Sequence, residues 1–150
     1  MTEKHKQLVQ STFEKIVPIS DQAAALFYAR LFELDPSLRV LFHSNLTEQG
    51  RKLMQVLGFA VRGLGDLERL VPAVEDLARR HVRYGVLPGH YETVGGALLW
   101  TLEKGLGEAF TLETREAWSE VYTLLASVMK GAAYAEIVLS PDNTETVANA

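Results

Sequence analysis

The fold is decided by one segment, Leu77-Ala-Arg-Arg-His-Val-Arg-Tyr-Gly-Val86, which predicts the end of an amphipathic helix. Its histidine, His81, shares a helix face with apolar residues, because these positions are spaced i, i+3, i+4 and i+7. Gly85 predicts the stop of this helix, since glycine readily takes the left-handed conformation that ends helices. An imidazole on an apolar face either satisfies its hydrogen bonds inside the core or binds a ligand. The apolar residues of the face are Val74, Leu77 and Ala78.

The composition describes a single packed domain with a small negative charge. The chain has 150 residues, of which 47% are hydrophobic, and this length is sufficient for one sizeable core. The formal net charge is −4 at pH 7, whereas a nucleic-acid-binding surface would need a basic patch, so no nucleic-acid partner is expected. The chain contains no cysteine, which excludes disulfides, thiolate catalysis and metal centres built on cysteine.

The hydropathy pattern predicts a soluble protein. The first residues, Met-Thr-Glu-Lys-His-Lys, lack the apolar core of a secretion signal. No run of about 18 apolar residues is present, so no membrane-spanning helix is expected. We therefore expect a cytoplasmic location and no membrane partner.

Helical periodicity runs through nearly the whole chain, and no segment shows the alternation typical of a strand. Thr47 and Thr111 are the expected N-caps of two helices, Gly107 is an expected stop, and Pro72 suits the first turn of the helix that carries His81. The sequence therefore predicts an all-α domain of six or seven helices. The other expected helical segments are 3–17, 23–34, 47–64, 90–106 and 111–139, with a short turn over 38–42.

Three polar residues interrupt the apolar stripes of three different helices, namely Tyr28, Gln49 and His81. Each side chain would cost stability if it were buried without a partner. One explanation is an internal hydrogen-bonded cluster, which would make the domain a structural or regulatory helical module. The other is a ligand pocket with an axial base on one wall and hydrogen-bond donors on the opposite wall.

Short motifs in a fixed order give the chain a resemblance to a known family. They are Phe27-Tyr-Ala with Phe32, Asp35-Pro36, Val40-Leu-Phe42, Gln49-x-Arg-Lys-Leu-Met-Gln, Arg80-His81-x-x-Tyr84-Gly-Val and His90-Tyr91-x-x-Val94-Gly95. In these motifs the chain resembles the globins, and specifically bacterial single-domain globins close to the globin part of flavohaemoglobins, over residues 3–139. The resemblance implies a globin fold of six to eight helices around a haem pocket. We expect a globin domain over residues 1–139 and a polar, disordered tail over residues 140–150.

The resemblance implies haem b (iron protoporphyrin IX) in the core, with His81 as the proximal ligand of the iron. The ligating nitrogen must be unprotonated, which a neutral imidazole provides near pH 7, and the second ring nitrogen is expected to donate to the backbone carbonyl of Leu77. Phe42 is expected to pack flat on the porphyrin, while Lys52 and Arg80 either pair with the propionates or remain solvated surface charges. The other residues expected around the cofactor are Leu53, Val56, Leu57, Tyr84, Val86, Tyr91, Val94, Leu98 and Leu125.

The distal side of the implied pocket carries Gln49, with Tyr28 as its partner from another helix and Leu53 beside them. Bound dioxygen carries partial negative charge, and a hydrogen bond to a charged group contributes roughly 1.5–3 kcal/mol. Two such donors shift affinity by about two to four decades, because ~1.4 kcal/mol corresponds to tenfold. The sequence therefore predicts tight oxygen binding with slow release.

The resemblance allows three functions. The first is a haem protein without enzymatic activity that reversibly holds and transports oxygen at a five-coordinate iron and also binds gases such as NO and CO. The second is nitric oxide dioxygenation, which flavohaemoglobins perform with a fused flavin- and nicotinamide-dependent reductase domain. No such domain and no Gly-rich dinucleotide turn is expected in this chain, so that activity would need a separate reductase. The third is an oxygen sensor, which would need an output partner.

Flavohaemoglobins also stiffen their proximal histidine with a tyrosine and a glutamate. Tyr91 matches the tyrosine, whereas the glutamate position falls at Ala133, and Glu136 lies further along the same helix. This departure argues against a peroxidase-like push on the iron. His43 is expected at the surface, with an entry gate or a sixth iron ligand as alternatives, and His90 is expected to face solvent or a neighbouring helix.

Overall fold

The computed structural model describes residues 2–42, 45–83 and 85–139, and over these ranges it consists of α-helices and 3₁₀ turns without a strand. This confirms the predicted all-α class. The α-helices are α1 (Glu3–Ile16), α2 (Ser20–Leu34), α3 (Leu46–Arg62), α4 (Leu67–Arg83), α5 (His90–Leu106) and α6 (Leu112–Leu139). The 3₁₀ turns are η1 (Val17–Ile19), η2 (Pro36–Leu41), η3 (Gly63–Gly65) and η4 (Gly107–Ala109).

Several helix ends follow the local sequence as predicted. Thr111 caps α6, since its Oγ1 accepts a hydrogen bond from the N–H of Thr114 at 3.2 Å. Gly107 ends α5 with a φ of +56°, a conformation that glycine adopts without a steric penalty. The predicted cap at Thr47 is wrong, because the side chain of Asn45 caps α3 and accepts the N–H of Thr47 at 2.7 Å.

The start of α4 also differs from the prediction. The helix begins at Leu67, so Pro72 lies inside it rather than in its first turn. The carbonyl of Asp66 accepts the N–H groups of Arg69 and Leu70 at 3.3 and 3.1 Å, which starts the helix before the proline. Proline has no N–H to continue this ladder, and the packing of α4 on α6 stabilises the helix in its place.

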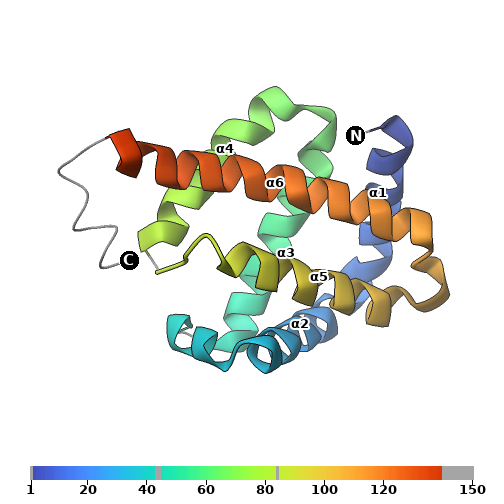
Figure 1. Cartoon of the computed structure of the whole chain (residues 1–150). Helices are drawn as coiled ribbons and strands as arrows, with labels where there is room; N and C mark the ends of the chain where they lie inside the picture. Colours follow the sequence, from blue (N-terminus) through green and yellow to red (C-terminus); the bar gives the residue numbers. More distant parts are fainter. Residues whose placement is uncertain (1, 43–44, 84, 140–150) are drawn as a thin grey trace.

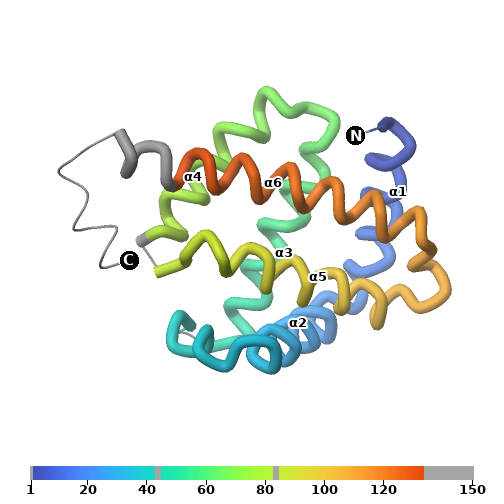
Figure 2. Tube along the Cα trace, in the orientation of Figure 1, coloured from blue at the N-terminus to red at the C-terminus, as the bar shows by residue number. Residues whose placement is uncertain are grey.

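The helices pack in pairs that keep α3 and α4 apart. α4 and α1 pack on α6, while α2 packs on both α5 and α3. α3 and α4 follow each other through η3, yet over the described ranges they have at most a marginal contact. Figure 1 shows these two helices meeting at η3 and diverging from it, and Figure 2 shows the same course, with α5 and α6 crossing in front of α3.

The buried apolar side chains form two clusters. The larger one surrounds Trp118 of α6, which is 1% exposed and whose Nε1 donates to Oγ1 of Thr12 at 2.9 Å. The second is built on Phe27 and Tyr28 of α2. Leu98 of α5 packs against both clusters, so α5 connects the two parts of the core.

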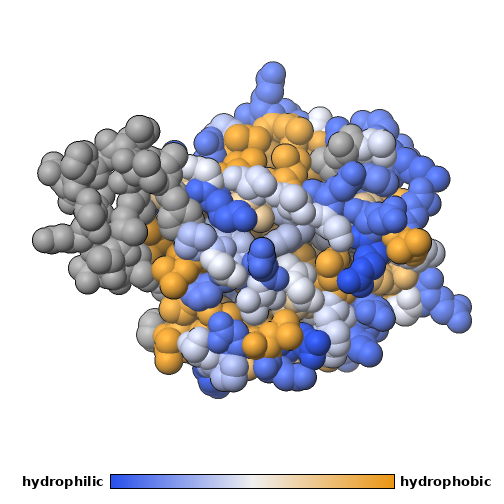
Figure 3. Space-filling model, viewed as in Figure 1, coloured by the Kyte–Doolittle hydropathy of each residue, from blue (hydrophilic) through white to orange (hydrophobic). Residues whose placement is uncertain are grey.

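The surface mixes polar and apolar side chains. Figure 3 shows hydrophilic residues interspersed with several separate apolar patches over the face in view. Single exposed apolar side chains such as Val40 and Leu112 are ordinary on a protein surface. In the described part of the chain, no helix combines the length and the apolarity that a membrane crossing requires.

Candidate functional site

The imidazole of His81 is held by its own helix. Its Nδ1 lies 2.9 Å from the carbonyl oxygen of Leu77, one turn earlier in α4. A carbonyl can only accept, so Nδ1 carries the proton, and the neutral ring has its lone pair on Nε2. Burial lowers the pKa of His81, and the charge of Arg80 acts in the same direction, against the opposing effect of the Leu77 carbonyl. The ring is therefore neutral and orientated near pH 7, and the expected contact with Leu77 is confirmed.

Tyr28 lies in the second core cluster and is 6% exposed. Its ring is 5.3 Å from the ring of Phe42 in an edge-to-face arrangement and 6.1 Å from that of Phe32 in a stacked one. Within the described part of the chain, the phenolic hydroxyl forms no hydrogen bond to the protein. The alternative of a core tyrosine bonded to a backbone carbonyl is therefore not what the structure shows. Burial raises the pKa of Tyr28 to about 12, so the hydroxyl remains a donor.

Gln49 is half-buried on α3, next to a close approach of α3 to α2. At its neighbour Gly50, an added Cβ would lie 2.8 Å from Cβ of Ala24 and 3.9 Å from Cε2 of Tyr28. The glycine therefore lets the two helices touch beside Tyr28. In this way Tyr28 and the start of α3, which carries Gln49, are held at one end of the α2–α3 contact.

The residues of the predicted apolar wall are divided between the two core clusters. Leu53 and Val94 pack on the Tyr28 cluster, Leu57 and Leu125 pack on the Trp118 cluster, and Leu98 packs on both. All five are only half-buried, although residues of this kind are usually buried in a core. Apolar side chains of α3, α5 and α6 that are only half-buried leave surface available to a flat apolar group. The remaining members of the predicted wall are Leu77 and Val86, which are half-buried, and Val56, which is 40% exposed.

The predicted charged partners are exposed. Lys52 lies on the solvent side of α3. Arg80 is exposed on α4 and lies 3.5 Å from the carboxylate of Asp76 on the same helix. This exposed pair contributes little to stability, so Arg80 can exchange it for another anion. Tyr84 and His43 fall outside the described residues.

The predicted proximal network is present only in part. Tyr91 is 6% exposed at the start of α5, and Ala133 of α6 is 5% exposed. The side chain of Glu136 falls outside the described part of the chain.

Sequence reasoning missed the role of Tyr122 in α6. Its hydroxyl donates to the backbone oxygen of Tyr91 at 2.5 Å, and its ring lies over Gly95. A Cβ at Gly95 would be 2.7 Å from Cε2 of Tyr122, so only glycine accommodates the ring. The available signal was Gly95 inside a helix whose neighbouring positions are apolar, together with a tyrosine on the apolar face of α6.

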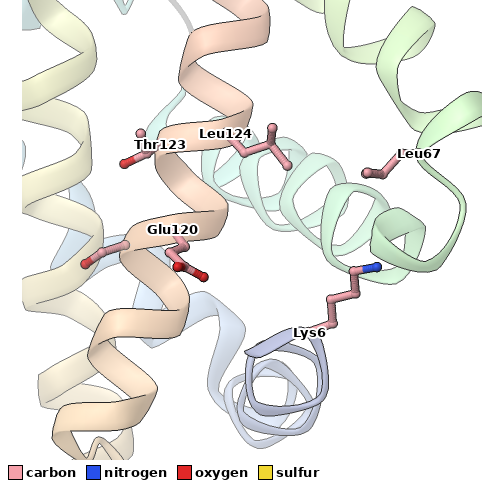
Figure 4. A pocket seen from close by; sticks show the side chains of 6 residues that line it. Lys6, Leu67, Glu120, Thr123 and Leu124 are labelled. Carbon is pink, nitrogen blue, oxygen red and sulfur yellow. The ribbon is translucent and has the colours of Figure 1, made fainter. Parts of the chain in front are cut away.

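Elsewhere, a recess of about 610 Å³ opens between α1, α4 and α6. Figure 4 shows that its walls combine Lys6 and Glu120 with the small or apolar side chains Thr123, Leu124 and Leu67. It is far from His81 in the fold and carries only ordinary surface chemistry, so it is not the candidate site.

A metal held by side chains alone is not supported. Within residues 2–42, 45–83 and 85–139, no group of three or more His, Cys, Asp or Glu side chains could hold an ion. A metal at His81 would therefore have to arrive inside a prosthetic group that supplies the other ligands, as haem does.

Comparison with known proteins agrees with this interpretation. The globin family model matches residues 25–129. Neuroglobin from Chaenocephalus aceratus is 32% identical over 143 residues, which cover 86% of this chain and 90% of that protein. Neuroglobin from Danio rerio is also 32% identical over the same length. The flavohemoprotein of Vibrio cholerae is 31% identical over 142 residues, which cover 91% of this chain but only 36% of that protein.

Proposed function

Because the chain belongs to the globin family, whose members bind haem, we propose that it is a haem-binding globin that reversibly binds O2. CO and NO are further ligands in this proposal, because they share the small size and the coordination chemistry of O2. We propose that it acts as a cytoplasmic oxygen carrier rather than as an enzyme.

The residues of the site fit haem b. The half-buried apolar side chains of α3, α5 and α6 would contact the flat porphyrin, and Phe42 would lie beside it. His81 would hold the iron through Nε2, because Nδ1 is occupied by the Leu77 carbonyl. When bound, the haem supplies a metal with one open coordination position for a diatomic gas. Lys52 and Arg80 are proposed partners of the propionates.

The opposite wall would supply hydrogen-bond donors to the gas. Tyr28 is 6% exposed, its hydroxyl forms no hydrogen bond to a described residue, and burial raises its pKa to about 12, so it stays protonated at physiological pH. The amide of Gln49 would act as a second donor from α3. Donors fixed in an apolar surrounding favour a ligand with partial negative charge, such as O2, over the apolar CO.

The single observation that carries the proposal is the hydrogen bond between His81 Nδ1 and the Leu77 carbonyl. It fixes both the tautomer and the orientation of the ring, which is the usual arrangement of a metal-ligating histidine.

The experiment is the replacement of His81 by glycine and by alanine, with a pyridine haemochrome assay on each purified protein. We expect one haem per wild-type chain, a loss of haem or a changed Soret band in both variants, and recovery in His81→Gly on addition of imidazole. His5→Ala is the matched control, since His5 pairs with Glu120 on the α1–α6 surface and its variant should bind haem normally. Unchanged haem content and spectrum in His81→Ala would contradict the proposal.

The coordination number is tested by the ferrous spectrum without added gas. We propose five-coordinate iron with His81 as its only protein ligand, which gives a single broad visible band. A sharp two-banded spectrum would show a sixth protein ligand, and His43 is the first residue to replace in that case.

The similarity to a flavohemoprotein supports nitric oxide dioxygenation as a second candidate function. In this alternative a separate reductase would supply the electron that each turnover consumes. Nitrate formation is measured after adding NO to the oxygenated protein with NADH and a reductase. More nitrate than haem, formed over repeated additions, would support the enzyme, whereas one nitrate per haem would support the carrier.

A further inference from the structure

The segment that joins the end of α4 to the start of α5 at His90 is called the α4–α5 corner. Backbone hydrogen bonds stabilise it on the side of α4. The N–H of Val86 donates to the carbonyl of His81 at 3.1 Å, and Gly85 donates to the carbonyl of Val82 at 3.0 Å. Gly85 makes this turn with a φ of +91°, which strains any residue with a side chain. The backbone of His81 is thus directly bonded to the corner.

On the side of α5 the corner is closed by a reciprocal pair. The backbone N–H of His90 donates to the carbonyl of Leu87, and the N–H of Leu87 donates to Nδ1 of the His90 ring, both at 3.0 Å. α5 has no other side-chain cap, since Gly89 stands at the N-cap position. The ring of His90 therefore takes the place of a capping side chain and holds the chain that leads to it.

The residue after His90 is fixed to a different helix. The backbone oxygen of Tyr91 accepts the hydroxyl of Tyr122, so the first turn of α5 is bonded to α6. α4 itself packs on α6. Between these anchored ends, the hydrogen bond from the Leu87 N–H to the His90 ring spans part of the turn.

We propose that His90 is a positioning residue for the gas-binding site, because its Nδ1 accepts the Leu87 N–H and so fixes the α4–α5 corner that holds the backbone of His81. This inference rests on the proposed function of His81. The imidazole of His90 acts only through the corner and does not contact the cofactor or the gas.

The test uses two variants of the full-length protein loaded with haem. His90→Ala removes the acceptor, whereas His90→Asn keeps one, because the Oδ1 of asparagine can occupy the position of the histidine Nδ1. His5→Ala again serves as a control at a distant histidine. The first measurement is amide hydrogen exchange at Leu87 and Val86 in the carbonmonoxy form, which is diamagnetic. The second is the iron–histidine stretching band of the ferrous protein by resonance Raman spectroscopy.

We expect Leu87 to exchange about fivefold faster or more in His90→Ala, as the loss of one hydrogen bond implies, with a shifted or broadened iron–histidine band. His90→Asn should restore both the slow exchange and the wild-type band. An unchanged band in His90→Ala would overturn the positioning role even if exchange increased. A His90→Asn variant that behaves like His90→Ala would overturn the role of the acceptor. A haem-free wild-type protein in the haemochrome assay would instead overturn the proposed function, and the inference with it.

Discussion

Replacing Tyr28 by phenylalanine removes one hydroxyl from the proposed distal wall and little else. The ring contacts with Phe27, Phe32 and Phe42, at centroid distances of 5.2, 6.1 and 5.3 Å, do not involve the hydroxyl. In the described part of the chain this hydroxyl forms no hydrogen bond to the protein, so no partner there is left unsatisfied. The variant should therefore fold as the wild type does, and any change in gas binding reports the lost donor.

The size of the effect follows from the strength of one hydrogen bond to a charged acceptor. Such a bond contributes roughly 1.5–3 kcal/mol, and every ~1.4 kcal/mol corresponds to a factor of ten. If the loss appears in the dissociation rate, as is usual for related complexes, O2 should leave Tyr28→Phe at least about tenfold faster. CO binding should change much less, because CO carries little charge.

The assay is stopped-flow displacement of O2 by CO, followed in the Soret region. His5→Ala is the control, since His5 pairs with Glu120 on the α1–α6 surface, outside the proposed distal wall. Its O2 release should stay within about threefold of the wild type. An unchanged rate of O2 release in Tyr28→Phe would refute the role of the Tyr28 hydroxyl. An equal acceleration in Tyr28→Phe and in the control would refute the placement of that hydroxyl beside the gas.

Three further predictions concern the same wall. Gly50→Ala should lower the stability by about 1–3 kcal/mol despite the better helix propensity of alanine, because its Cβ would lie 2.8 Å from that of Ala24; urea unfolding measures this, and an unchanged midpoint contradicts the close approach. Gln49→Leu should also speed O2 release, and its combination with Tyr28→Phe should be non-additive in stopped flow, since both donors act on one ligand; strict additivity would show that they act separately. Finally, the pKa of Tyr28, raised from 10.0 to about 12, means that the folded state holds this proton more tightly than the unfolded state. Stability of up to about 3 kcal/mol, fully present below pH 10, should be lost as the pH rises toward 12, and urea titrations should show a smaller loss in Tyr28→Phe.

The features that the sequence predicts correctly depend on short stretches of chain. The periodicity around His81 predicts a helix, and the resemblance to globins implies the Nδ1 contact with Leu77, which lies one turn earlier. Gly85 and Gly107 have positive φ values, as expected of stops that need a residue without a Cβ. Thr111 caps α6 because the cap and its partner are three residues apart.

The features that it misses depend on tertiary contact or on competition between neighbours. Asn45 and Thr47 are both good caps, and only the path of the chain into α3 decides between them. Pro72 favours a first turn locally, yet the packing of α4 on α6 extends the helix before it. The hydrogen bond from the Tyr122 hydroxyl to the Tyr91 backbone joins residues on different helices. The hydropathy pattern of neither helix indicates such a contact.

Because α3 and α4 diverge from η3, a small rotation at η3 would displace the far end of each helix. Gln49 and His81 stand near the far ends of their helices, so at 1.5 Å per residue each lies about 20 Å from the joint. A rotation of about 3° at η3 would therefore change their separation by about 1 Å. A Cβ added at Gly63, within η3, would lie 3.1 Å from Cδ1 of Leu70, whereas one added at Gly65 would meet no atom within 4 Å. Gly63→Ala, with Gly65→Ala as its control, would therefore test whether the proposed gas-binding site responds to a displacement at a joint that lies far from it.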